Sequence, residues 1–217
     1  MDLMSRYPDK HFELAIVDPP YFEGPNKSGF YGKGVSSLGV QRTKFRAEIQ
    51  EWEIPTEEYF IELNRVSKNQ IVWGANHFSD NMPISSSSCY IVWDKDNGKS
   101  NFADAEIAYT SFKSAVRIFK YMWNGMHQGS YGGDVSKNEK RIHPTQKPIK
   151  LYEWLLMKYA KKGDKILDTH LGSGSIAIAC FNLGYHLTAC DLDTVVYNDS
   201  INRIDNHISQ GRLRFPE

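Results

Sequence analysis

Four consecutive residues near the start of the chain, Asp18, Pro19, Pro20 and Tyr21, have the right types and spacing to bind an amino group. They follow the apolar run 12–17, which predicts a buried strand ending before Asp18, because proline cannot continue a central strand. The two prolines fix the backbone, so the Asp18 and Tyr21 side chains project from the carboxyl edge of the sheet. The alternative is a strand that ends in a tight turn of no chemical importance.

The chemistry that these residues could perform follows from the electronic structure of an amino group on a nucleic-acid base. Its lone pair is delocalised into the ring, so the nitrogen is a poor nucleophile. A carboxylate from Asp18 and the backbone carbonyl of Pro19 would accept its two N–H bonds and localise that pair. Tyr21, together with Phe22, would stack on a base rotated out of a duplex. The four residues are therefore candidates for activating a base nitrogen.

A glycine-containing turn in the last third of the chain predicts a site for a nucleoside. The pattern there reads strand 165–167, turn 168–175, helix 176–183, strand 186–190 and helix 195–208. This βαβα order requires a parallel sheet. Glycines in the turn let the backbone approach a ligand, and the following helix presents free N–H groups. Asp191 closes the next strand, where a carboxylate can accept hydrogen bonds from ribose hydroxyls. Taken alone, the pair Gly172 and Gly174 would also be expected in a turn with only a structural role or in a binding site for NAD.

A third segment, His143-Pro-Thr-Gln-Lys-Pro148, directly precedes a helix predicted at 150–160. Thr145 and Lys147 could bind a carboxylate through a hydroxyl and an ammonium group beside the helix N-terminus. Taken alone, the segment is more typical of a solvated linker whose prolines begin a helix.

Charge is distributed unevenly along the chain. The formal net charge is zero, which argues weakly against a nucleic-acid binder, because such domains are usually basic. Residues 113–150, however, hold eight Lys or Arg against two Asp or Glu, an excess of 8 − 2 = 6 positive charges. A local excess of this kind is expected where a phosphate backbone is contacted.

The three cysteines, Cys89, Cys180 and Cys190, form no close pair and no cluster with histidine, so neither a disulfide framework nor a metal site is expected. The apolar runs are too short to cross a bilayer, and the first twenty residues lack the layout of a secretory signal. We therefore expect a cytoplasmic protein without a metal.

The remaining elements are predicted from periodicity. Apolar residues recur at helical spacing over 56–66, with Thr56 as a suitable N-cap. Short apolar runs predict further strands at 70–73, 89–93, 105–110 and 117–123. The glycine-rich stretch 23–50 shows little periodicity, and a loop of this length in a compact domain is usually functional or disordered.

Aromatic residues divide into two groups. Trp73, Phe78 and Trp93 are expected in the core. The second group, Tyr121, Trp123, His127 and Tyr131, is interleaved with lysines. This pattern suits contact with bases and phosphates, but also a hairpin whose aromatic side chains face the core.

Together, the three motifs resemble the permuted β-group of DNA amino-methyltransferases, in which Asp-Pro-Pro-Tyr comes first, His-Pro-Thr-Gln-Lys-Pro follows, and the glycine turn comes last. The resemblance spans residues 12 to about 205, and residues 71–78 look like the phage and prophage branch. It implies a single α/β domain over residues 1–217 with the Rossmann-like methyltransferase fold. That fold is doubly wound and circularly permuted, with a mostly parallel seven-stranded sheet. Residues 23–50 would form a mobile active-site loop and 111–142 a small target-recognition insertion.

The resemblance also implies roles for individual residues. Asp18 to Tyr21 would be catalytic and would transfer the methyl group directly, without a covalent enzyme intermediate. The residues expected to bind S-adenosylmethionine are His143, Thr145, Lys147, Asp168, Leu171, Gly172, Gly174, Ser175, Asp191 and Leu192. Thr145 and Lys147 would lie at its methionine carboxylate. The chain departs from the family where Thr169 and His170 replace Pro-Phe and where Ser175 replaces threonine. We interpret His170 as a packing residue and not as a catalyst.

Double-stranded DNA is the substrate that the resemblance implies, with adenine N6 favoured over cytosine N4 because the tetrapeptide begins with Asp and not Ser. The residues expected to contact DNA are Lys27, Lys33, Arg42, Lys44, Lys120 and Arg141. We expect a homodimer, since so small a chain has little surface to grip a duplex.

An RNA methyltransferase would use the same site, whereas a non-catalytic nucleic-acid-binding module or a nicotinamide-dependent oxidoreductase is disfavoured by the intact tetrapeptide. Enzymes that methylate protein glutamine carry the cofactor turn before Pro-Pro-Tyr, unlike this chain.

Overall fold

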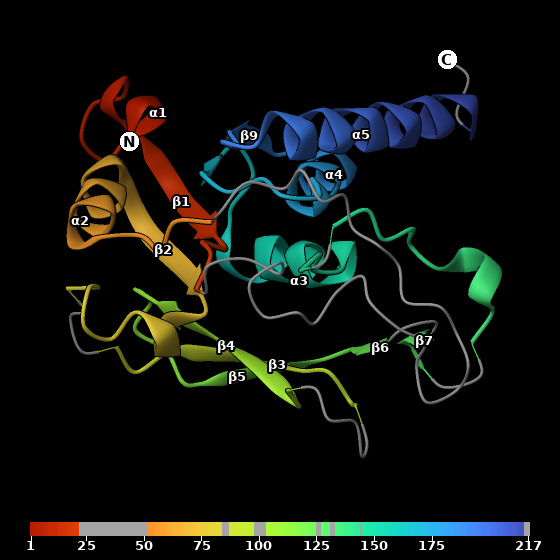
Figure 1. The fold of residues 1–217 in the computed structure, drawn as a ribbon, viewed down its shortest axis with the longest axis horizontal. Coiled ribbons are helices and arrows are strands. Elements are labelled where there is room, and N and C mark those ends of the chain that lie inside the picture. Colours follow the sequence, from red (N-terminus) through yellow and green to blue (C-terminus); the bar gives the residue numbers. More distant parts are fainter. Residues whose placement is uncertain are drawn as a thin grey trace.

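The computed structural model describes residues 1–21, 52–83, 87–97, 103–124, 127–130, 133–143 and 145–214. The predicted loop at 23–50, with Lys27, Lys33, Arg42 and Lys44, lies outside the described residues. The elements in chain order are α1 (Asp2–Ser5), β1 (Phe12–Val17), α2 (Glu57–Val66), β2 (Ser67–Trp73), η1 (Ala75–His77), β3 (Tyr90–Asp94), β4 (Ala105–Thr110), β5 (Arg117–Lys120), β6 (Met122–Asn124), β7 (His127–Gly129), η2 (Val135–Lys137), α3 (Ile149–Tyr159), β8 (Lys165–Asp168), α4 (Ser175–Leu183), β9 (His186–Ala189) and α5 (Thr194–Arg214) (Figure 1).

A seven-stranded sheet with the order β5-β3-β4-β2-β1-β8-β9 forms the centre of the molecule. Its neighbouring strands pair in parallel, except that β4 runs antiparallel to both β2 and β3. The mostly parallel seven-stranded α/β sheet predicted from the sequence is therefore confirmed. The run 117–123, predicted as one strand, is divided: β5 ends at Lys120, and β6 forms a separate hairpin with β7. The division occurs at Tyr121, whose N–H donates to Asp94 O at the end of β3.

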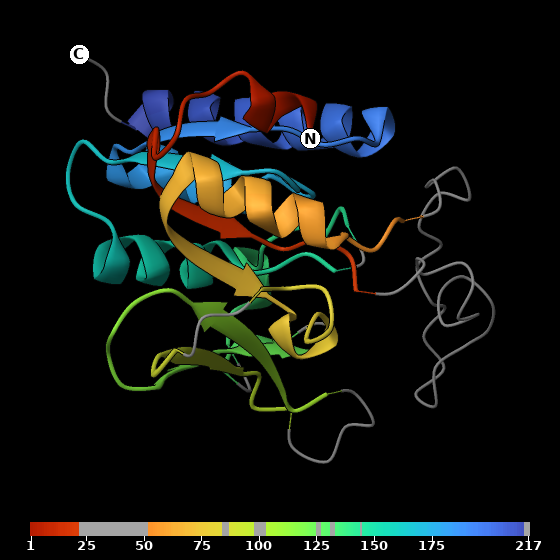
Figure 2. The same cartoon turned by 90° about the vertical axis from the view of Figure 1, so that its left-hand side faces the viewer.

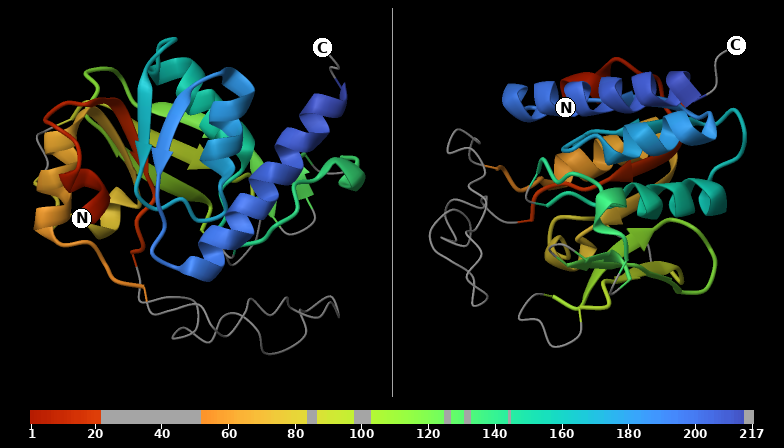
Figure 3. Two further views of the ribbon diagram at one scale, coloured as in Figure 1. Left: turned by 90° about the horizontal axis from the view of Figure 1, so that it is seen from above. Right: turned by 90° about the vertical axis from the view of Figure 1, so that its right-hand side faces the viewer.

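Helices cover both faces of the sheet. Figure 2 shows α2 lying across β1 and β2, and Figure 3 shows α3, α4 and α5 on the opposite side. α2 buries Tyr59, Phe60, Leu63 and Val66, whose spacing places them on one face of the helix. Thr56 is the N-cap residue as predicted, although its side chain makes no capping hydrogen bond.

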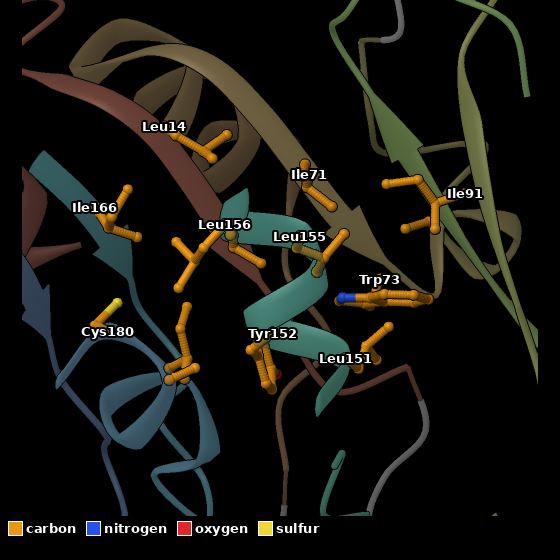
Figure 4. Close-up of a cluster of buried hydrophobic side chains, with 14 of the residues drawn as sticks. Leu14, Ile71, Trp73, Ile91, Leu151, Tyr152, Leu155, Leu156, Ile166 and Cys180 are labelled. Atoms are coloured by element: carbon orange, nitrogen blue, oxygen red, sulfur yellow. The ribbon is translucent and has the colours of Figure 1, made fainter. Parts of the chain in front are cut away.

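The larger core cluster lies between the sheet and α3. Leu14, Ile71 and Ile166 come from adjacent strands, and their side chains meet Leu155 and Leu156 of α3 (Figure 4). Trp73, Phe78 and Trp93 are all buried, as expected from the sequence. This packing fixes α3, and with it the segment that leads into the helix, against the carboxyl ends of the strands.

The pairing of β1 with β8 places the two principal motifs side by side. Ala15 lies opposite Leu167 in a parallel register, so both strands end at the same edge of the sheet. Asp18 follows β1, and Asp168 ends β8. The strand that carries the tetrapeptide and the strand that leads into the glycine turn are therefore neighbours.

Some boundaries differ from the predicted ones. α5 ends at Arg214 and not at residue 208, because no proline interrupts it and a glycine inside a helix costs only about 1 kcal/mol. The short helix α1 has too few residues to show a period and was not predicted. None of the helices in the described ranges is long and apolar enough to cross a membrane.

The α3 packing can be tested with a pair of variants. Leu155 is fully buried in the core, whereas Met157 on the same helix is 65% exposed. Leu155→Ala should lower the free energy of unfolding by about 2–5 kcal/mol, because it removes buried methyl groups and leaves a cavity. Met157→Ala should change it by less than about 0.5 kcal/mol. Urea unfolding measures both values, and equal effects would contradict the assigned packing.

Candidate active site

A single pocket at the carboxyl ends of β1, β8 and β9 collects all three sequence motifs. Its walls include residues 18–21, 145–147, 170–173 and 191–193. His143 and Ser175 complete the set that comes from the predicted motifs. Segments separated by about 150 positions in the sequence thus share one cavity, as expected at the carboxyl edge of a doubly wound sheet.

Most of the predicted cofactor residues line this pocket. They are His143, Thr145, Lys147, Leu171, Gly172, Ser175, Asp191 and Leu192. Asp168 and Gly174 are not in the lining. Asp168 is buried beneath the turn, and its Oδ1 accepts the N–H of His170 at 2.9 Å. Gly174 has a φ of +75°, and a Cβ there would come within 3.0 Å of Ile204 on α5. These two residues therefore shape the turn and its packing from behind the pocket wall.

Asp191 organises the wall formed by the glycine turn. Its Oδ2 accepts the N–H of Gly172 at 2.8 Å, and its Oδ1 accepts the N–H of Asp193 at 3.0 Å. Burial raises the pKa of this carboxyl group, whereas the N–H donors act in the opposite direction. Each carboxylate oxygen keeps a further lone pair that can accept a hydroxyl. The adjacent Leu192 is 89% exposed on the pocket wall and offers an apolar surface to a ring.

An aromatic pair forms another part of the wall. The Trp52 and His143 rings are stacked, with centroids 5.7 Å apart. Burial lowers the pKa of His143 to about 4, so its ring is neutral at pH 7. Its Nδ1 lies 3.2 Å from Thr145 Oγ1, which orients both side chains. Trp52 was not identified from the sequence, because it lies between a segment without periodicity and the start of α2.

The catalytic candidate Asp18 lies in a corner of the pocket, beside the buried side chain of Lys147. Its Oδ2 forms an ion pair with Lys147, whose Nζ also lies 3.1 Å from Glu106 Oε2. Glu106 in turn pairs through Oε1 with Lys95, at 2.5 Å. Asp18 Oδ1 is buried and has no hydrogen-bond partner within the described part of the chain. The sequence analysis placed Lys147 at a cofactor carboxylate, but in this structure its ammonium group is held by Asp18 and Glu106.

The pKa values in this corner follow from burial and from these ion pairs. Burial raises the pKa of Asp18, opposed by Lys147 and supported by the negative charge of Glu106. Burial also opposes ionisation of Glu106, but Lys147 and Lys95 outweigh it and lower its pKa to about 2. For Lys147, the two carboxylates outweigh burial and raise the pKa well above its usual range. Glu106 lies on β4 and Lys95 directly follows β3, and neither belongs to a recognisable motif, so reasoning from the sequence missed both.

Tyr21 is held between a histidine and a glycine. Its ring stacks on His77 with centroids 4.6 Å apart and an interplanar angle of 7°. Gly74 has a φ of +69°, and a Cβ there would lie 2.5 Å from Tyr21 Cδ1. The turn after β2 therefore needs glycine at position 74 for two reasons: its backbone conformation and the close approach of the tyrosine ring.

His170, which replaces the usual aromatic residue, belongs to a buried polar chain. Thr169 Oγ1 lies 2.7 Å from Tyr59 Oη and 3.0 Å from His170 Nδ1. Burial lowers the pKa of His170 to about 4, so the ring is neutral at pH 7. His170 lines the pocket, and the packing role predicted for it stays a prediction.

The two described residues among the predicted DNA contacts are engaged within the protein. Lys120 forms an ion pair with Asp96 at 3.2 Å, and both side chains are exposed. Arg141 lies over the Trp123 ring, 4.5 Å from its centroid, and donates from Nη2 to Trp123 O at 3.0 Å. Trp123 is buried, and its Nε1–H donates to Gln146 O. For Trp123 the structure supports the alternative of a hairpin side chain facing the core.

Comparison with known proteins identifies the family. The model of the DNA methylase family N6_N4_Mtase matches residues 12–202. The chain belongs to this family. It is 25% identical over 221 residues to the Type II methyltransferase M.HhaII of Haemophilus parahaemolyticus, an alignment that covers 94% of this chain and 92% of the relative.

Solved structures share the fold. The M1.HpyAVI–SAM complex is 19% identical with a TM-score of 0.51, covering 93% of this chain and 92% of that one. The PvuII cytosine-N4-specific DNA methyltransferase is 12% identical with a TM-score of 0.55, covering 96% and 88%. The protein is a DNA methyltransferase, and its cofactor is S-adenosylmethionine. The pocket fits that cofactor: a carboxylate and an exposed leucine for a nucleoside lie in the same cavity as Asp18.

The support of Tyr21 by Gly74 can be tested with matched alanine variants. Gly74→Ala should reduce methyl transfer to DNA at least about tenfold, because the new Cβ displaces the tyrosine ring. Gly184 has a similar φ of +72° but has no atom within 4 Å of its Cβ position, so Gly184→Ala is the control. Each variant carries a backbone strain of about 1–2 kcal/mol. Equal turnover in the two variants, measured with the same DNA, would contradict the contact.

Proposed function

We propose that the protein transfers a methyl group from S-adenosylmethionine to the exocyclic N6 of an adenine rotated out of double-stranded DNA. The observation that carries this proposal is the position of Asp18. One of its oxygens is held by Lys147, and the other is a buried acceptor with no partner among the residues that the structure describes, in the same pocket as the glycine turn. An acceptor without a partner is costly in a folded protein, and such atoms commonly serve a ligand.

Each cofactor-binding residue is proposed to contact the part of S-adenosylmethionine that its chemistry suits. When bound, S-adenosylmethionine supplies a methyl group on a positively charged sulfur. Asp191 would accept hydrogen bonds from ribose hydroxyls, and Leu192 would pack on the adenine ring. Gly172 lets the backbone approach the ligand, and Thr145 would donate its hydroxyl to the methionine carboxylate. Each of these residues faces the shared cavity.

The tetrapeptide acts on the target base. Asp18 Oδ1 and the Pro19 carbonyl accept the two N–H bonds of the amino group and localise its lone pair on nitrogen. Tyr21, backed by His77, offers a flat surface on which the base stacks. Asp18 Oδ1 also lies where it can accept the proton that the amino nitrogen must lose after methylation.

Adenine is favoured over cytosine because Asp18 begins the tetrapeptide where serine is the commoner residue in cytosine-N4 enzymes. The fold does not distinguish these substrates, since the PvuII enzyme, a cytosine-N4 methyltransferase, shares it. Cytosine N4 is therefore the second candidate substrate. RNA is a third and less favoured one.

Several narrower assignments belong to the same proposal. The order of the motifs, with β1 before β8, supports the permuted β-group, and residues 71–78 support its phage-like branch. The relative M.HhaII is a Type II methyltransferase, which supports a role in restriction and modification. Lys27, Lys33, Arg42 and Lys44 are proposed to contact the DNA backbone, and the enzyme is proposed to act in the cytoplasm.

The substrate is tested by incubating the protein with labelled S-adenosylmethionine and mixed-sequence duplex DNA, then mapping the modified base. We expect label on adenine N6 within one short sequence. Label on cytosine N4 would support the second candidate, and label on RNA alone would contradict a DNA substrate.

The role of Asp18 is tested by Asp18→Ala. Turnover should be abolished, because the amino group loses its carboxylate acceptor, whereas the Kd for S-adenosylmethionine should stay within about threefold. Glu57→Gln, which neutralises an exposed carboxylate at the start of α2, is the control. An Asp18→Ala variant that still methylates DNA would remove Asp18 from the mechanism.

A homodimer is proposed because the chain offers little surface for gripping a duplex. Light scattering at the concentration of the assay should give twice the mass of the 24.9 kDa chain. An active enzyme with the mass of one chain would contradict the dimer.

A further inference from the structure

A row of four buried or half-buried charges leads from the end of β3 to the target-base corner of the pocket. Lys95, Glu106, Lys147 and Asp18 alternate in sign, and each is in ion-pair contact with the next. The side chains of Lys147, Glu106 and Lys95 are 2%, 19% and 17% exposed. Only the last member, Asp18, belongs to the tetrapeptide.

The antiparallel strand β4 makes this arrangement possible. A parallel strand at its position would bring its first residues to the opposite edge of the sheet. Because β4 is reversed, Glu106 near its beginning lies beside Trp93 at the carboxyl end of β3. Lys147 comes from the segment before α3, and its Nζ also lies 5.4 Å from the centre of the Trp73 ring. Two strands and one loop thus converge on Asp18.

The energetics point to a purpose beyond stability. Removing charges from water costs several kcal/mol for each ion, and well-packed apolar side chains often stabilise a fold as much as a buried ion pair. Here the row ends on the carboxylate of Asp18. It engages one oxygen, and the other has no partner in the part of the chain that the structure describes. Lys147 already has two carboxylate partners, so a third, from the cofactor, would add an unbalanced negative charge.

We propose that Lys147, held in place by Glu106, is a positioning residue that fixes the Asp18 carboxylate through Oδ2 and leaves Oδ1 for the amino group of the base. This inference rests on the proposed function. It assigns Lys147 to the target-base side of the pocket and not to the methionine carboxylate of the cofactor. Glu106 acts through Lys147, and Lys95 acts through Glu106.

The ion pairs affect the pKa of Asp18, so they should also affect how the methyltransferase activity depends on pH. The titratable groups that act on Asp18 or on its partner Lys147 are Lys147, Glu106, Lys95, Asp168, Tyr21 and Tyr152. Lys147 lowers the pKa of Asp18, whereas Glu106 raises it. The acid limb of the pH profile is the range in which activity falls as Asp18 becomes protonated. Removing the ammonium group of Lys147 should therefore move this limb to higher pH, and removing the Glu106 charge should move it to lower pH.

The experiment measures kcat, KM for DNA and the Kd of S-adenosylmethionine between pH 5 and 10 for Lys147→Met and Glu106→Gln. At pH 7, Lys147→Met should lose about 100-fold in kcat, the effect of a misplaced catalytic group, and recover part of it at alkaline pH. Its cofactor Kd should change less than about threefold. Glu106→Gln should show a smaller loss in kcat and an acid limb displaced in the opposite direction.

Lys158→Met and Glu57→Gln are the controls, because both replace exposed charged side chains on helices. Opposite displacements of the acid limb in the two test variants, with both controls unchanged, would support the positioning role. A merely structural role would lower the folded fraction and leave the limb in place, which would overturn the proposal. A cofactor Kd weakened more than about tenfold in Lys147→Met, with the pH profile unchanged, would return Lys147 to the methionine carboxylate.

A thermal measurement separates this inference from the proposed function. Lys147→Met leaves Asp18 and Glu106 without their shared counter-ion, so the already raised pKa of Asp18 should rise further, and the pKa of Glu106 should rise from its lowered value. Groups with raised carboxyl pKa values stabilise the fold at low pH and lose that contribution as pH increases. The Tm deficit of Lys147→Met relative to wild type should therefore shrink between pH 8 and pH 5.

A Tm deficit that stays the same between pH 8 and pH 5 would overturn the charge row, even if the enzyme methylates DNA. If the Tm deficit of Lys147→Met shrinks but the wild-type protein modifies no nucleic acid, the proposed function is refuted and the ion pairs of the charge row are supported. If Lys147→Met does not fold, Glu106→Gln decides: an acid limb displaced to lower pH supports the row, and an unchanged limb overturns it.

Discussion

The parallel pairing of β1 with β8 is the constraint on which the site depends. It joins a strand from the beginning of the chain to one near its end, and both strands stop at the same edge of the sheet. Asp18 and the glycine turn then share a cavity without any long loop to connect them. A shift of one residue in this register would turn the side chains of β1 to the opposite face, so the core packing of Leu14 and Ile166 also fixes the geometry of the site.

Electrostatics gives the two sides of the cavity different characters. On the cofactor side, Asp191 is bound by backbone N–H groups and lies next to exposed apolar surface. On the proposed target-base side, Asp18 is bound by a buried ammonium group, and its other oxygen has no partner among the described residues. The first arrangement suits a nucleoside with hydroxyls to donate. The second suits an amino group that must be held by a charged acceptor.

The fold could be predicted from the sequence because local signals and long-range order agreed, and the motifs singled out there line one pocket. Strand 12–17 was bounded correctly by its prolines, and the βαβα unit near the end of the chain required parallel pairing. Lys147 shows the limit of this reasoning. Its motif indicated an ammonium group beside a helix start, but its partner Glu106 lies on a reversed strand whose register no local pattern reveals. Gly174 shows another limit, because a glycine that contacts a ligand and one that admits a neighbouring helix look alike in sequence.

The most direct test of the account is a crystal structure with the cofactor product and duplex DNA containing the target sequence. The decisive measurement is the distance from Asp18 Oδ1 to the amino nitrogen of the base. The account predicts hydrogen-bond contact, about 2.7–3.2 Å, with Lys147 Nζ still on Oδ2. A base amino group out of reach of Asp18, or Lys147 moved to the cofactor carboxylate, would contradict it.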